Sequence, residues 1–147
     1  MIKRSTLAVL AVLVTTPTIA PAQQGDFMRR QSFTLPVALI DADSFEVIEA
    51  DGAGGSQLWC AAGLYVRKVL GQRGGDIYVE TPRGPAQSMA GRKGVVFTTA
   101  PTQTAIPSFT LGVRRAGLTH SMSLSYALCS DLPQLRLRLS DGTLVRR

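Results

Sequence analysis

Residues 54–71 read GGSQLWCAAGLYVRKVLG and form the strongest helix pattern in the chain. Apolar side chains recur at spacings of three and four between Leu58 and Val69, which places them on one face of a helix. The Ser56 hydroxyl stands where it could cap the first helical turn. The pattern therefore predicts one main amphipathic helix over residues 57–70.

Glycines mark the middle and the end of this predicted helix. Gly71 follows the last turn, with Gly74 and Gly75 close behind, and is typical of a helix C-terminus. Gly63 stands in the middle, where glycine weakens a helix by about 1 kcal/mol relative to alanine. We expect Gly63 to allow the helix to pack closely on a sheet.

Segments rich in strand-forming residues flank the helix on both sides. Pro36 interrupts the first of them, and because proline lacks an amide hydrogen we expect an edge or interrupted strand there. The clearest alternation of apolar and polar residues covers residues 121–128. These segments predict an α+β fold, with the helix packed on a mostly antiparallel sheet. The expected strands are residues 32–40, 44–50, 76–81, 94–99, 108–114, 121–128 and 134–139.

A hairpin is predicted near the C-terminus, around Asp141-Gly142. Leucine alternates with arginine just before this turn, which is typical of a half-buried strand. A two-residue loop would pair Leu139 with Leu144, whereas a three-residue loop would pair Leu137 with Val145. The pattern leaves both loops open.

The first 22 residues have the three-part pattern of a secretory signal peptide. Lys3 and Arg4 precede the apolar residues 7–14, and small residues lead up to Ala22. Eight apolar residues make about 12 Å of helix, well short of a hydrocarbon core of about 30 Å. We therefore expect cleavage after Ala22 and a periplasmic or secreted protein.

Loss of the leader would reduce the 16 Lys and Arg residues to 14, against 10 Asp and Glu. A net charge of about +4 is small for a nucleic-acid-binding protein, so we expect no nucleic-acid partner. No second long apolar run follows, so we expect no membrane-spanning segment after cleavage. We expect residues 23–31 to form a flexible arm and residues 32–147 to form a single α+β domain.

The chain contains two cysteines, Cys60 and Cys129. In an oxidising compartment this even number predicts one disulfide, worth about 4 kcal/mol in the chain-entropy model. Both cysteines have apolar neighbours and no adjacent cation, so neither shows the surroundings of an activated thiol. Two buried free thiols, a catalytic thiol and pairing between chains stay open as alternatives.

The sequence contains no recognisable catalytic, metal-binding or cofactor-binding motif. His120 is the single histidine, and the two cysteines stand far apart. The acidic residues 41–51 lack the spacing of a calcium loop, and we interpret them as a solvated turn. The glycine turn at residues 52–55 lacks the remaining positions of a phosphate loop. We therefore expect no metal and no cofactor.

An enzyme remains the alternative interpretation. A helix cysteine, Cys60, and a histidine from a later strand region, His120, share the general layout of papain-like thiol hydrolases that act on cell-wall peptides. The local motifs of that family do not match, and Cys129 offers Cys60 a simpler partner. We interpret His120 as a surface turn residue.

Basic residues gather in and after the predicted helix, whereas acidic residues concentrate before residue 52. Such segregation steers proteins toward anionic surfaces. Aromatic residues do not interleave with these cations, as they do in proteins that bind single-stranded nucleic acid. We expect an anionic polymer of the cell envelope, or another envelope protein, as the partner. The candidate anion-binding residues are Arg67, Lys68, Arg83, Arg92 and Lys93.

Several short segments carry a resemblance: LWCAA at 58–62, DIYV at 76–79, PRGP at 82–85, GRKGVVFT at 91–98, and Tyr126 with Cys129. Together they resemble small exported bacterial two-cysteine proteins of unassigned function. The resemblance spans roughly residues 45–131 and implies export and a cystine, but it assigns no activity and no functional residue. We therefore expect a non-catalytic envelope protein that serves as a binding or structural module.

Overall fold

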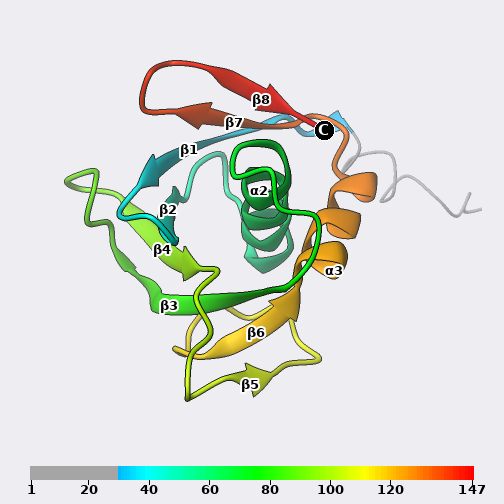
Figure 1. The fold of residues 1–147 in the computed structure, drawn as a ribbon. Helices are drawn as coiled ribbons and strands as arrows, with labels where there is room; N and C mark the ends of the chain where they lie inside the picture. The colour runs from blue at the N-terminus through cyan, green and yellow to red at the C-terminus, as the bar shows by residue number, and fades with distance from the viewer. Residues whose placement is uncertain (1–29) are drawn as a thin grey trace, which may run out of the picture.

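The computed structural model describes residues 30–147, in which an eight-stranded sheet curls around the helix α2 (Gly55–Lys68) (Figure 1). The strand order is β5-β6-β3-β4-β2-β1-β7-β8. Neighbouring strands are antiparallel, except for the parallel pairs β1–β7 and β5–β6. The predicted α+β fold with a mostly antiparallel sheet is confirmed. The strands are β1 (Phe33–Leu39), β2 (Ser44–Ile48), β3 (Asp76–Pro85), β4 (Lys93–Thr98), β5 (Ile106–Pro107), β6 (Leu118–Ser121), β7 (Leu135–Leu139) and β8 (Leu144–Arg146).

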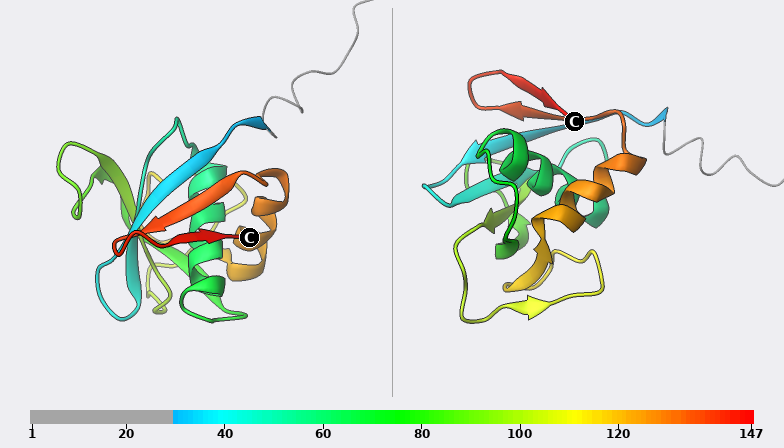
Figure 2. Two further views of the ribbon diagram at one scale, coloured as in Figure 1. Left: turned by 90° about the horizontal axis from the view of Figure 1, so that it is seen from above. Right: turned by 45° about the vertical axis from the view of Figure 1, so that its right-hand side comes forward.

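Helix α2 is buried on all sides over residues 57–66. The sheet encloses one side, and the short helix α3 (Met122–Ala127) with the 3-10 helix η1 (Leu128–Asp131) covers the other (Figure 2). The main helix is therefore where the pattern predicts it, but it lacks the solvent-facing side of an ordinary amphipathic helix. This explains why Ala and Gly are frequent between its large apolar residues.

The start of α2 is capped by Gln57 and not by Ser56 as predicted. The helix begins at Gly55, and the Gly54 N–H donates to Gln57 Oε1 at 3.0 Å. The Ser56 hydroxyl donates to the same oxygen at 3.0 Å. Because the helix starts two residues earlier than expected, Ser56 lies inside its first turn.

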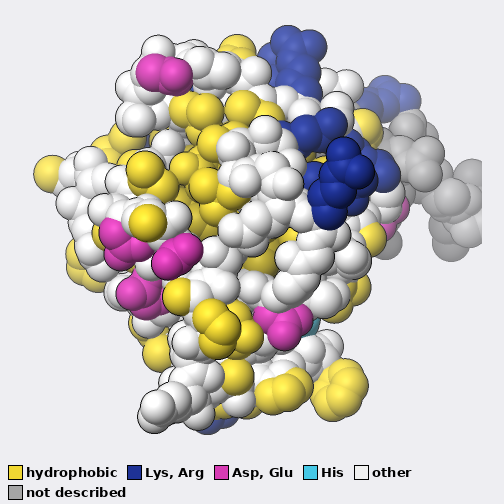
Figure 3. Space-filling model, in the orientation of Figure 1, with side chains coloured by type: hydrophobic (Ala, Val, Ile, Leu, Met, Phe, Trp, Pro, Cys, Tyr) yellow, Lys and Arg dark blue, Asp and Glu magenta, His cyan; other side chains and the backbone are white. Residues whose placement is uncertain are grey.

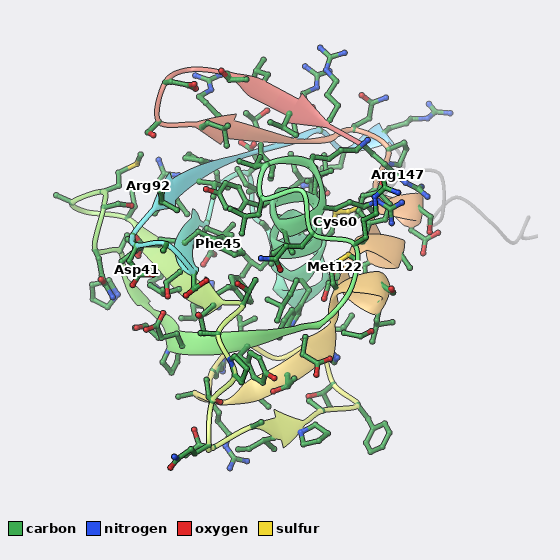
Figure 4. The ribbon with its side chains drawn as sticks, viewed as in Figure 1. Asp41, Phe45, Cys60, Arg92, Met122 and Arg147 are labelled. Carbon is green, nitrogen blue, oxygen red and sulfur yellow. A yellow bond between two sulfur atoms is a disulfide. The ribbon has the colours of Figure 1, made fainter. Side chains whose placement is uncertain are left out.

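Aromatic side chains fill the space between α2 and the concave face of the sheet. The Trp59 ring lies 5.0 Å from that of Phe97, and the Tyr65 ring lies 4.4 Å from that of Phe45. Figure 4 places Phe45 beside the helix, near the centre of the molecule. These rings join the helix to β2 and β4, and such pairs contribute roughly 0.5–1.5 kcal/mol beyond the area they bury.

Pro36 lies inside the sheet, because β1 stands between β2 and β7. The predicted edge strand is therefore wrong. Pairing with β2 begins only at Val37. On the same strand edge, two residues before Pro36, the Thr34 N–H donates to the Asp51 carboxylate at 2.8 Å instead of to a strand. The hydrogen that Pro36 lacks would thus lie just outside the stretch over which β1 pairs with β2.

Two predicted strands are not strands. Residues 121–128 form the end of β6 and then α3, because the Ser121 side chain accepts a hydrogen bond from Leu124 N at 3.2 Å and caps a helix. Residues 108–114 form a loop after the two-residue strand β5. Their alternation was too short a signal to separate these conformations. The C-terminal hairpin has the three-residue loop, with Leu137 opposite Val145.

The predicted disulfide between Cys60 and Cys129 is confirmed, with a Cα–Cα distance of 5.1 Å. It joins α2 to η1, and both residues are buried. The helical path of residues 122–131 turns Cys129 toward α2, which a strand there would not have done. Within residues 30–147, no helix is long and apolar enough to cross a membrane. The predicted leader and most of the predicted arm, residues 1–29, lie outside the described residues.

Candidate anion-binding cleft

Four basic residues line an open cleft of about 600 Å³ beside the β3–β4 hairpin. Three of them, Arg83, Arg92 and Lys93, are among the predicted anion-binding residues. The fourth, Arg114, comes from the loop between β5 and β6 and was not predicted. Arg114 lies beside the hairpin because β6 pairs with β3. No local pattern near residue 114 indicates that pairing.

One residue, Glu49, orients two of the three arginines of this cleft. Arg83 donates from Nε to Glu49 Oε2 at 2.6 Å and from Nη2 to Oε1 at 2.5 Å. Arg92 Nη2 donates to the Glu49 main-chain oxygen at 2.8 Å. The bond to Glu49 raises the pKa of Arg83, so that this guanidinium stays charged. Among residues 30–147, no ion pair of Lys93 or Arg114 is found, so both charges are available to a ligand.

The hairpin that carries Arg92 is held by a buried carboxylate, Glu46, which is 1% exposed. Its oxygens accept hydrogen bonds from Gln87 N at 2.8 Å, Ser88 N at 2.7 Å and the Ser88 hydroxyl at 2.5 Å. Gly94 leaves room for this side chain, since a Cβ there would lie 2.8 Å from Glu46 Oε1. The interpretation of the acidic segment as a solvated turn is therefore wrong at Glu46, which fixes the hairpin to β2.

We expect the substitution Glu46→Gln to lower the free energy of unfolding by about 1–2 kcal/mol. The amide would place an NH₂ group against the N–H of Gln87 or Ser88, so the buried side chain at position 46 would lose a hydrogen bond. Urea unfolding followed by far-UV circular dichroism measures the change. The exposed Glu80 of β3 provides the matched control, and Glu80→Gln should have almost no effect. Equal midpoints for the two variants would contradict the assigned role of Glu46.

The remaining predicted anion-binding residues, Arg67 and Lys68, lie elsewhere, in the last turn of α2. The Arg67 guanidinium stacks over the Tyr126 ring at 4.4 Å, and that of Arg147 lies 5.6 Å from the same ring. Figure 3 shows basic side chains gathered on this side, where Figure 4 labels Arg147, with Arg92 on the opposite side of the view. The predicted set is thus divided between two separate surfaces.

The two residues of the thiol-hydrolase alternative do not form a catalytic pair in the structure. Cys60 Sγ is bonded to Cys129, and a thiol mechanism requires a thiolate. His120 is 5% exposed, so its interpretation as a surface turn residue is wrong. Its ring lies against Trp59 at 4.5 Å, and its Nε2 lies 3.0 Å from Thr110 O. His120 therefore anchors a loop to the core.

Neither a metal site in the described residues nor a match to a known protein indicates the function of the cleft. Within residues 30–147, no group of three or more His, Cys, Asp or Glu side chains is placed to hold a metal ion. Comparison of the chain with protein-family models, with curated proteins and with solved structures found no match. The resemblance to small exported two-cysteine proteins therefore stays a prediction.

Proposed function

We propose that the protein is an exported, non-catalytic binding module that takes an anionic component of the cell envelope into the basic cleft. The observation that carries this proposal is the convergence of Arg83, Arg92, Lys93 and Arg114 on one open cleft. Cationic side chains gathered in a cleft concentrate the positive field and favour anionic ligands. Glu49 neutralises part of this charge, and in return it holds two of the arginines in place before a ligand arrives.

Export is supported by the leader pattern and by the disulfide. Structural disulfides persist in oxidising compartments such as the periplasm and the extracellular space. Cell-envelope components there carry phosphate or carboxylate groups, which bind arginine through paired hydrogen bonds. A periplasmic or secreted location therefore fits the charge of the cleft. Expression of the full chain, followed by fractionation and N-terminal sequencing, tests the location and the cut after Ala22.

The charge-reversing double substitution Arg92→Glu with Lys93→Glu should weaken binding to soluble inorganic polyphosphate by roughly tenfold or more. The two new carboxylates would repel the polyanion from the mouth of the cleft. Binding is measured by fluorescence anisotropy of labelled protein. For the wild type, affinity should fall steeply between about 50 and 500 mM sodium chloride, because salt screens exposed charges.

The matched control is Arg138→Glu with Arg146→Glu, which changes the net charge equally on the distant strands β7 and β8. Both arginines are exposed, so the control variant should fold normally. It should bind polyphosphate nearly as well as the wild type. Equal losses in both variants would show attraction by net charge alone, and salt-independent binding would equally count against the cleft.

A further inference from the structure

The loop after β5 presents the Phe109 side chain entirely to solvent, with a relative exposure of 105%. Pro107 and Thr110 beside it are also exposed. An aromatic ring in water contributes nothing to folding, since folding is driven by removing such surface from water. Figure 1 shows β5 and this loop at the edge of the molecule, on the far side of β6 from the rest of the sheet.

The core holds this loop in place, so the exposure of Phe109 does not result from a loosely attached segment. The Thr110 main-chain oxygen accepts a hydrogen bond from His120 Nε2 at 3.0 Å. Gly112 O accepts one from Trp59 Nε1 at 3.3 Å. Both donors are buried side chains. The loop is therefore anchored on the C-terminal side of Phe109, and the ring is displayed at a defined position.

Phe109 and several arginines line the same hollow. This hollow of about 630 Å³ is lined by this loop and by the start of α2, and its lining includes Phe109, Arg114 and Arg115. The hollow shares Arg83 and Arg114 with the basic cleft. Both Arg114 and Arg115 are exposed. One face of the molecule thus combines a displayed aromatic ring with the basic cleft of the proposed function.

We propose that this face docks on an anionic phospholipid bilayer, with Phe109 inserted at the interface and Arg114 and Arg115 on lipid phosphates. The inference rests on the proposed function and names its ligand. Peripheral binding to membranes adds buried apolar surface to attraction by anionic headgroups, and this face supplies both. A soluble polyanion would use the same cations and leave Phe109 in water, so the aromatic ring distinguishes the two ligands.

The test is co-sedimentation of the protein with vesicles of phosphatidylcholine alone or mixed with phosphatidylglycerol. We expect binding to the mixed vesicles and little to phosphatidylcholine. The substitution Phe109→Ala should weaken vesicle binding by roughly tenfold and leave polyphosphate binding unchanged. The control Leu144→Ala removes an exposed apolar side chain from β8, at the opposite edge of the sheet, and should bind vesicles as the wild type does.

A second measurement detects insertion directly. In the variant Phe109→Trp, the fluorescence of the new indole should shift to the blue and be quenched by brominated lipids when anionic vesicles are added, whereas the buried Trp59 should not respond. Vesicle binding unaffected by Phe109→Ala, or polyphosphate binding without vesicle binding, would overturn membrane docking and leave the proposed function intact. Binding to neither probe would overturn both.

Discussion

Replacing both disulfide cysteines, Cys60→Ala with Cys129→Ala, will lower the free energy of unfolding by about 4 kcal/mol. The cysteines are separated by 69 positions, so the bond removes a large loop entropy from the unfolded chain. It also attaches η1 to α2, the buried central helix of the fold. Because small domains have only about 5–15 kcal/mol of stability, this single change should bring the protein close to unfolding. Urea unfolding at 25 °C measures the loss.

Reduction of the wild type should reproduce this loss without any substitution. Dithiothreitol should move the urea midpoint of the wild type toward that of the double variant, and it should leave the double variant unchanged. Thiol titration of denatured, periplasmically expressed protein should detect no free thiol. Two free thiols, or equal midpoints for the wild type and the double variant, would contradict the assigned bond and reopen the thiol-hydrolase alternative.

The disulfide could be predicted from the number of cysteines, and the main helix could be predicted from a local pattern. In a chain with a leader pattern, two cysteines are expected to form a disulfide with each other. The spacing of apolar residues in 57–70 is typical of a helix. The conformation of residues 121–128 depends instead on one side chain, that of Ser121. The Ser121 hydroxyl caps a helix. The serines that follow suggest an exposed strand face, but Ser125 is buried in α3 and its hydroxyl donates to Ser121 O at 3.0 Å.

The candidate site likewise combines residues that are close in the chain with residues that only the fold brings together. Arg83, Arg92 and Lys93 lie in one turn region of the chain, and their proximity follows from the β3–β4 hairpin. Arg114 lies beside them because strands distant in the sequence pair with each other. Arg67 lies elsewhere, over the Tyr126 ring, because α2 ends on another side of the fold. The burial of His120 is likewise a tertiary effect, since a strand of four residues carries no pattern that separates inside from outside.

The substitution Gly63→Ala should destabilise the protein by roughly 2–3 kcal/mol, although alanine is the better helix former by about 1 kcal/mol. A Cβ at Gly63 would lie 2.4 Å from Tyr126 N and 2.6 Å from the Ser125 carbonyl carbon, both in the backbone of α3. Gly63 therefore allows close packing on a helix, not on the sheet as its position suggested. Because a backbone cannot rotate aside, α3 must move away from α2. Urea unfolding measures whether the substitution raises or lowers the free energy of unfolding. Helix propensity alone predicts a rise, whereas the packing against α3 predicts a fall.

The control for this substitution is Gly74→Ala, where a Cβ has nothing within 4 Å, and its effect should stay within about 0.5 kcal/mol. The disulfide offers a sharper test of the mechanism. Cys129 follows α3 closely and is tied to α2, so the bond resists the movement that an alanine at position 63 demands. In the background Cys60→Ala with Cys129→Ala, the cost of Gly63→Ala should therefore fall by more than about 0.5 kcal/mol. Full additivity would show that α3 does not move, and a stabilising Gly63→Ala would show that the two backbones are not in contact.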